Sequence, residues 1–260
     1  MDRRRRAASN GRATAPSGQL ATDGGSRSLW FDPPTDDDQD RRPRLTRDRV
    51  VAEALAVIAQ DGIQALTMRS LAARLGVVPG AVYHHVRNKQ QLQDLVLDNV
   101  LAEVDVHLDH ALGWTDQLKA LAHRLRQVLE QHPGVAGILK TRDPLGPHSL
   151  ALAEAFLEPL QAAGFGDRDA GLAFFLLVDY TIGFAVSDMS TSVNEQRVRD
   201  PATRAQLHQF FRSLPPDQFP ALVALGEHVW ADNRDERFSA GLDALIAGLE
   251  HAHNSSSDPS

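Results

Sequence analysis

The sequence predicts an all-α fold: a small N-terminal domain of three helices, a long connecting helix and a larger helical domain. From residue 44 onward, apolar residues recur every three or four positions, which gives a helix one apolar face. No run in this part alternates apolar and polar residues as a half-buried strand would. Capping residues precede several of the apolar runs and indicate where helices begin.

The first two helices are expected after Leu45-Thr46 and after Leu66-Thr67. Thr46 is a plausible N-cap, Asp48 suits the first helical turn, and Asp61-Gly62 closes the first helix. Thr67 offers the second cap, immediately before Arg69.

The segment that follows Thr67 has the spacing of a helix-turn-helix. Counted from Met68, Ala72 is fifth, Gly76 is ninth and Val82 is fifteenth. Two closely crossing helices leave room for only a methyl group at Ala72, and the turn favours a glycine because it reaches the left-handed region freely. Val82 is expected to lock the second helix onto the first. The same spacing also arises by chance in helical hairpins rich in Ala and Leu, so the neighbouring caps decide the interpretation.

Asn88 caps a long helix that is expected from Lys89 to about Ala111. Another helix begins at Trp114-Thr115 and is broken by Pro133. A polar stretch with several prolines, 192–217, is expected to be mobile. Further helices are expected at about 133–140, 149–163, 167–191, 218–232 and 235–250.

Composition divides the chain into four parts. Residues 1–43 are an Arg-rich, low-complexity extension that we expect to be disordered. Residues 44–92 form the expected three-helix domain, 93–252 the larger helical domain, and 253–260 a frayed tail.

The net charge of −7 is unevenly distributed. Residues 45–92 carry six Arg and Lys against three Asp and Glu, whereas residues 93–260 carry twelve against twenty-four. A basic helix-turn-helix in an acidic chain indicates a nucleic-acid partner, with the acidic remainder facing away from it.

Five segments of the N-terminal domain together resemble a known protein family. Arg44-Leu-Thr-Arg-Asp-Arg-Val-Val, Gly62-Ile-Gln-Ala-Leu-Thr-Met-Arg-Ser-Leu-Ala, Leu75-Gly, Ala81-Val-Tyr-His-His-Val and Asn88-Lys89 resemble the DNA-binding domain of the TetR family of repressors. The pattern is nearest to the tetracycline-repressor branch, where residues equivalent to Tyr83, His85 and Lys89 contact phosphate. The resemblance implies that the second domain binds a ligand and forms the dimer.

The recognition helix has few side chains that read bases. Val78, Pro79, Gly80 and Ala81 occupy its base-facing start, and their side chains donate no hydrogen bond, although apolar contact with thymine methyls is possible. Arg69 resembles the family position that reaches guanine. We therefore expect DNA contacts from the following residues: a basic arm of Arg41, Arg42 and Arg44; Thr67 and Arg69; Val78, Pro79, Gly80 and Ala81; and Tyr83, His84, His85 and Lys89 as phosphate contacts, with packing of Tyr83 and simple exposure of a histidine as alternatives.

An aromatic and apolar pocket is expected in the second domain. Its central helix is apolar all round, so it should be buried on all sides, and one side can face a partner subunit while the other faces the pocket. By resemblance, Asp188 occupies the position of a carboxylate that helps to bind a magnesium–drug chelate, but Leu139 or a neighbour stands where the metal-binding imidazole should be. That departure argues against tetracycline. The expected pocket residues are Leu118, Leu121, Leu125, Phe156, Phe174, Tyr180, Phe184 and Asp188, with a surface position for Asp179 and Asp188 as an equal alternative.

Nothing in the sequence indicates catalysis, a metal site or a cofactor. There is no cysteine, which excludes disulfides and suits a reducing cytoplasm, and there is no Gly-rich phosphate loop. His107 and His110 could share a metal, but solvent-facing histidines are commoner. The apolar segment from Gly171 to Val186 is slightly short to span a membrane and contains Asp179, so we expect a core helix and no membrane association.

The sequence therefore predicts a homodimeric repressor that binds a palindromic DNA operator and is released by a small apolar or aromatic effector. Two alternatives stay open: an architectural or constitutive DNA-binding regulator without an effector, and a helical small-molecule-binding protein with incidental DNA binding.

Overall fold

The computed structural model describes residues 45–139, 144–199, 201–229 and 234–257, and within these ranges every regular element is a helix. This confirms the predicted all-α class. The elements are α1 (Arg47–Asp61), the 3₁₀ helix η2 (Ile63–Ala65), α2 (Met68–Leu75), α3 (Pro79–Tyr83), α4 (Lys89–Leu101), α5 (Trp114–Gln131), α6 (Ala136–Leu139), α7 (Pro147–Ala162), α8 (Asp167–Arg199), α9 (Pro201–Arg212), α10 (Pro220–Val229) and α11 (Arg234–Ser257).

The three predicted caps begin the helices where expected. The Thr46 hydroxyl accepts a hydrogen bond from the Arg49 N–H at 3.2 Å, and the Asn88 side chain accepts one from Gln91 at 2.8 Å. Thr67 forms a reciprocal capping box with Ser70 at the start of α2. Each cap satisfies N–H groups that the first helical turn leaves unpaired.

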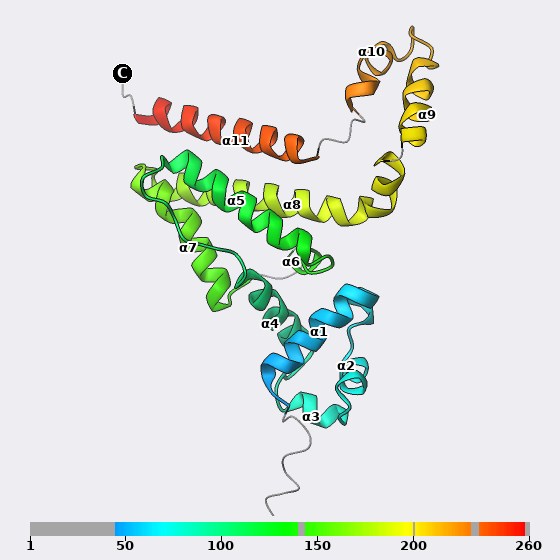
Figure 1. Ribbon diagram of the computed structural model, residues 1–260. Helices are drawn as coiled ribbons and strands as arrows, with labels where there is room; N and C mark the ends of the chain where they lie inside the picture. The colour runs from blue at the N-terminus through cyan, green and yellow to red at the C-terminus, as the bar shows by residue number, and fades with distance from the viewer. Residues whose placement is uncertain (1–44, 140–143, 200, 230–233, 258–260) are drawn as a thin grey trace, which may run out of the picture. The chain divides into compact units, whose positions relative to one another are not determined.

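The helix-turn-helix has the predicted geometry. Ala72 and Val82 are fully buried between α2 and α3, and Gly76 adopts the left-handed conformation with φ of 69°. Figure 1 shows α1, α2 and α3 grouped beside α4, and α1 packs directly against α2 and α4. A single hydrophobic cluster then continues from these helices into α5, α7, α8 and α11.

The prediction that the connecting helix reaches Ala111 was wrong, because α4 ends at Leu101. Beyond it, the Asp105 side chain accepts a hydrogen bond from the His107 N–H, and the Asp109 side chain accepts one from Ala111. Arg124 of α5 also donates to the carbonyl groups of Asp105 and His107. These bonds replace helical ones, because short acidic side chains compete with the backbone for its own N–H groups.

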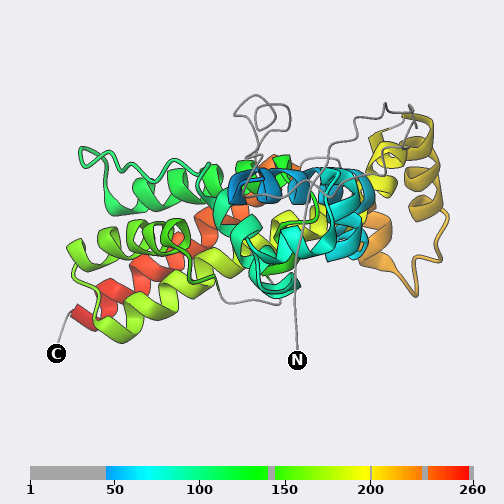
Figure 2. The same ribbon diagram turned by 90° about the horizontal axis from the view of Figure 1, so that it is seen from below.

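Helices also occupy most of 192–217, where the sequence analysis placed none. α8 continues to Arg199, and α9 occupies Pro201–Arg212. Extending an existing helix needs no new nucleus, so a polar sequence without an apolar face can continue it. α9 and α10 pack on each other as a hairpin, drawn in yellow and orange in Figures 1 and 2, and α9 contacts α8.

Within the single chain, α8 is buried on one side and open on another, and the burial of its open side against a partner subunit stays a prediction. It packs against α5, α7 and α11, but Leu172, Phe175 and Leu176 are exposed by 57%, 62% and 42%. By length and composition alone, its stretch Asp167–Val186 could cross a membrane. The contacts with three neighbouring helices give α8 instead one core-facing side and one open apolar side.

Candidate nucleic-acid interface and apolar cavity

The start of the recognition helix lies open to a partner. Val78 is its N-cap and is 71% exposed, an unusual position for a large apolar side chain, and Pro79 and Gly80 are exposed beside it. Ala81 is partly exposed, while Val82 points into the core. A Cβ at Gly80 would meet nothing within 4 Å, so the helix start has a shallow surface that another molecule could approach closely.

Polar groups surround this apolar start. Tyr83 is 52% exposed and His84 is exposed, while His85 and Lys89 are half-buried. Thr67 is exposed, with its hydroxyl engaged by Ser70. The phosphate-contact role of these groups stays a prediction.

The two arginines of α2 differ in their surroundings. Arg74 binds Glu53 at 2.6 Å and also contacts Gln60 and Asp61 on α1. Arg69 is exposed and makes no hydrogen bond or ion pair within the described part of the chain. Only Arg69 therefore has a guanidinium group available to a partner.

Four candidate residues cannot be placed. Arg41, Arg42 and Arg44 lie outside the described residues, and so does the side chain of Asp188. Asp179 is exposed on α8, which favours the surface interpretation that the sequence left open.

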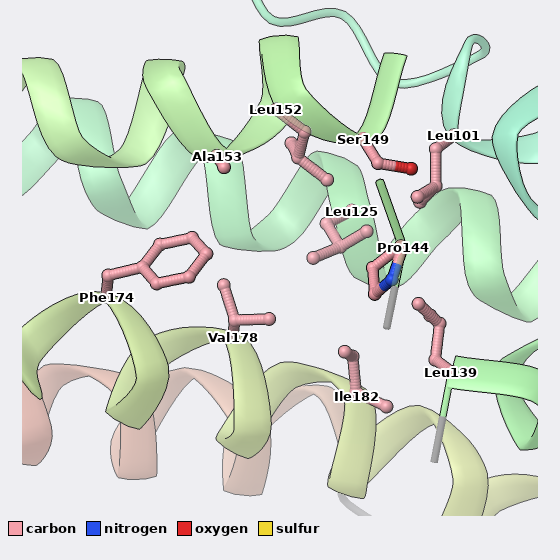
Figure 3. A pocket seen from close by; sticks show the side chains of 10 residues that line it. All are labelled: Leu101, Leu125, Leu139, Pro144, Ser149, Leu152, Ala153, Phe174, Val178 and Ile182. Atoms are coloured by element: carbon pink, nitrogen blue, oxygen red, sulfur yellow. The ribbon is translucent and has the colours of Figure 1, made fainter. Parts of the chain in front are cut away.

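An apolar cavity of about 60 Å³ lies between α7 and α8. Figure 3 shows Phe174, Val178 and Ile182 of α8 on one side, facing Ser149, Leu152 and Ala153 of α7. Leu101, Leu125, Leu139 and Pro144 complete the lining. Ser149 carries the lining's one side-chain hydroxyl, so the cavity favours an uncharged, apolar occupant.

Of the predicted pocket residues whose side chains the structure describes, Leu125 and Phe174 line this cavity. Leu118, Leu121 and Phe156 are fully buried in the hydrophobic core instead. The helical spacing of apolar residues identified buried positions, but it could not separate a packed core from a cavity wall, because both are apolar.

Tyr180 and Phe184 lie on the side of α8 that meets α11. Tyr180 stacks on Phe238 with ring centroids 5.4 Å apart and donates a hydrogen bond to the Phe238 carbonyl at 2.9 Å. Phe184 packs edge-on against Phe238, and the buried Arg126 guanidinium lies 4.7 Å from the Phe238 ring centre. Arg126 also pairs with Asp235 at 2.7 Å. These groups hold α11 on α5 and α8, and a role of Tyr180 and Phe184 in ligand binding stays a prediction.

Asp98, which joins α4 to the first turn of α7, was not predicted from the sequence. Its carboxylate accepts hydrogen bonds from the backbone N–H groups of His148 and Ser149 at 3.0 and 3.1 Å. Burial acts to raise the pKa of Asp98, but the hydrogen bonds from His148 and Ser149 outweigh burial and hold that pKa below its ordinary value. No sequence signal pairs residues fifty positions apart.

No group of three or more side chains suited to a metal ion occurs within the described ranges. His107 lies in the loop after α4, where its N–H is held by Asp105.

Comparison with known proteins gives two family matches. Residues 50–95 match the model of bacterial regulatory proteins of the tetR family, and residues 109–253 match the tetracyclin repressor-like C-terminal domain. An HTH-type transcriptional regulator from Saccharopolyspora erythraea is 34% identical over 91% of this chain and 97% of its own length. The tetracycline repressor protein class C from Escherichia coli is 29% identical over 83% of this chain and 95% of its own length.

Solved structures show the same similarity. The TetR family protein ActR of Streptomyces coelicolor, in complex with actinorhodin, aligns with a TM-score of 0.73 and 35% identity, over 80% of this chain and 96% of ActR. The matched models together span both the helix-turn-helix and the C-terminal helices. The chain therefore belongs to the TetR family of bacterial regulatory proteins and is a ligand-responsive, DNA-binding transcriptional repressor.

Proposed function

We propose that the chain acts in the cytoplasm as a homodimeric repressor without enzymatic activity, which binds a palindromic operator and leaves it when a small apolar or aromatic molecule binds. The observation that carries this proposal is the pairing of two features on one continuous core: an open recognition helix and an apolar cavity between α7 and α8. α4 connects the two, because it follows the recognition helix directly and packs against α7.

The exposed apolar face of α8 supports the homodimer. Leu172, Phe175 and Leu176 recur at helical spacing on one side, and α11 beside them carries the half-buried Leu245 and Leu249. Two copies that meet through these helices would bury the exposed leucine and phenylalanine side chains. A two-fold dimer of this kind presents two recognition helices about 34 Å apart, which requires an inverted-repeat operator.

The residues of the DNA-binding surface divide into base contacts and phosphate contacts. Arg69 has an available guanidinium group for a guanine edge, and Val78 and Ala81 offer apolar contact to thymine methyls. Tyr83, His84, His85 and Lys89 surround the helix as phosphate contacts, with Thr67 at the start of α2. Arg41, Arg42 and Arg44 precede α1 and could add minor-groove contacts.

The cavity lining supports an uncharged effector with a large apolar surface. ActR, a relative at 35% identity, binds actinorhodin, which makes polycyclic aromatic compounds sensible first candidates for this chain. Burial of apolar surface provides roughly 25 cal/mol per Å², so a large flat ligand could supply the binding energy without a charge partner. Ile138 and Leu139 in α6 offer no imidazole, so α6 supplies no histidine ligand for the metal of a chelated tetracycline.

The experiment is operator selection followed by release. Sequences that bind the full chain are enriched from random duplex DNA, and the selected operator is then used to screen uncharged polycyclic compounds for displacement, starting with actinorhodin. We expect an inverted repeat whose affinity falls steeply with salt and at least one compound that releases it. Enrichment of sequences without two-fold symmetry would contradict the dimeric repressor.

An architectural regulator would select the same kind of operator but would not respond to any compound. The similarity to ActR, whose solved structure holds actinorhodin, favours the responsive repressor.

A further inference from the structure

Asp98 caps the N-terminus of α7 from a different helix. One of its carboxylate oxygens accepts hydrogen bonds from the backbone N–H groups of His148 and Ser149 and from the Ser149 hydroxyl, at 3.0, 3.1 and 3.2 Å. The other oxygen lies 2.9 Å from His148 Nδ1. This is the role of an N-cap side chain, which satisfies the unpaired N–H groups of the first turn and faces the positive end of the helix dipole.

The residue at the N-cap position itself is Gly146, which has no side chain to do this. A Cβ at Gly146 would overlap the Asp98 carboxylate. The close approach of α4 to α7 therefore depends on both residues: a glycine that leaves the space and an aspartate that fills it.

The capped turn is also the wall of the cavity. Ser149 is 6% exposed and lines the cavity, and Leu152 and Ala153 line it one turn further along α7. The cavity measures about 60 Å³, whereas sites for drug-sized ligands measure roughly 300–1,000 Å³. A polycyclic ligand needs more room than this, and a movement of α7 away from α8 that provides it would pull on the turn that Asp98 holds.

We infer that Asp98 is the positioning residue that transmits occupancy of the cavity to the DNA-binding helices. This inference rests on the proposed function. Asp98 lies on α4 nine residues after Lys89, about 13 Å along one rigid helix, so a displacement at Asp98 moves the end that follows the recognition helix. The segment after α4 is joined to α5 by Arg124 and to the C-cap of α5 by the 2.9 Å contact between Glu103 and His132, so α4 is held there while Asp98 follows α7.

The test replaces the ligand with a bulky side chain introduced into the cavity wall, called the wedge below. Ala153→Trp places a side chain larger than the cavity against α8 and should displace α7. Ala151→Trp is the matched control, since Ala151 is exposed on the same helix. Each substitution is made in the full-length parent and in Asp98→Ala, and the dissociation constant for the selected operator is measured for all six proteins.

We expect Ala153→Trp to weaken operator binding at least tenfold in the parent and less than about threefold in Asp98→Ala, which is the non-additivity of a coupled pair. Ala151→Trp should have no effect in either background. Asp98→Asn should keep most of the wedge effect, because the amide oxygen still accepts from the backbone N–H groups of α7.

Equal penalties for the wedge in both backgrounds would overturn the inference, and so would a wedge without effect in the parent. Either result leaves the proposed function standing, because operator binding and release by a compound are measured separately. Circular dichroism checks that each variant is folded, and Ala153→Phe replaces the tryptophan variant if that protein does not fold. A chain that selects no operator at all would end both the proposed function and this inference.

Discussion

Arg69 and Arg74 lie five residues apart on α2, yet only one of them is available to a partner. The ion pair with Glu53 and the contact with Gln60 hold Arg74 against α1, while Arg69 is exposed and has no partner among the described residues. Residue type alone does not distinguish the two. Their surroundings do, because a guanidinium group bound to a carboxylate must lose that partner before it can bind a base.

Substitution of these residues should separate base reading from positioning. Arg69→Ala should cost on the order of 1–3 kcal/mol at one base pair and relax sequence preference there. Lys89→Ala should weaken binding to all sequences alike and lower the salt dependence. The measurement is operator and scrambled-DNA affinity at several salt concentrations, with Arg74→Ala as the control that should alter stability more than specificity. An equal loss of affinity for both DNAs in Arg69→Ala would contradict its role as a base reader.

At the scale of elements, side-chain hydrogen bonds fix the start and the second half of α4. Asn88 caps its start, and Asp98 joins its second half to α7. The helices of the DNA-binding surface and of the cavity therefore share one connecting element whose ends have identifiable contacts.

Asn88→Ala should destabilise the fold by about 1 kcal/mol, because the Gln91 N–H loses its acceptor. Urea unfolding followed by circular dichroism measures this change. Asn99→Ala is the control, since Asn99 is exposed on the same helix, and it should leave the midpoint almost unchanged. A midpoint for Asn88→Ala equal to that of the control would show that the cap adds nothing.

The Asp98 contact should also appear in the pH dependence of stability. Its pKa is lower in the folded chain than the ordinary value of 3.8, so the folded state favours the ionised carboxylate. The stabilisation is therefore fully present above the unfolded pKa and is lost as the pH falls through the folded pKa. The difference in unfolding free energy between the parent and Asp98→Asn should be present at about pH 5 and narrow in more acidic solution. A difference that grows on acidification would have the wrong sign for this assignment.

For the whole molecule, the open face of α8 decides the expected assembly. Phe175→Glu should place a charge on the proposed dimer face, convert the dimer to a monomer and remove operator binding. Sedimentation velocity at micromolar concentration measures the assembly. Leu225→Glu is the matched control, because Leu225 is 53% exposed on α10 and should leave the dimer intact. A dimer that survives Phe175→Glu would move the interface elsewhere.

The N-terminal extension supplies a second expectation at this scale. Nine arginines precede Leu45, and the recognition helix has few donors of its own. Deletion of residues 1–40 should leave helicity unchanged and reduce operator affinity by loss of counterion release. Unchanged affinity of the truncated chain would assign residues 1–40 no part in DNA binding.

The sequence alone determined the fold class, the three caps and the helix-turn-helix, because these depend on neighbours within one or two turns: Thr46, Thr67 and Asn88 act on their own helices. Only the tertiary structure decided which apolar residues line a space and which pack solidly, since Leu121 and Leu125 have the same chemistry and the same helix face. It also decided where α4 ends, through the contacts of Arg124, and which carboxylate holds α7, through Asp98. Contacts between residues far apart in the chain depend on how helices pack in space, and the local pattern of one sequence does not contain that arrangement.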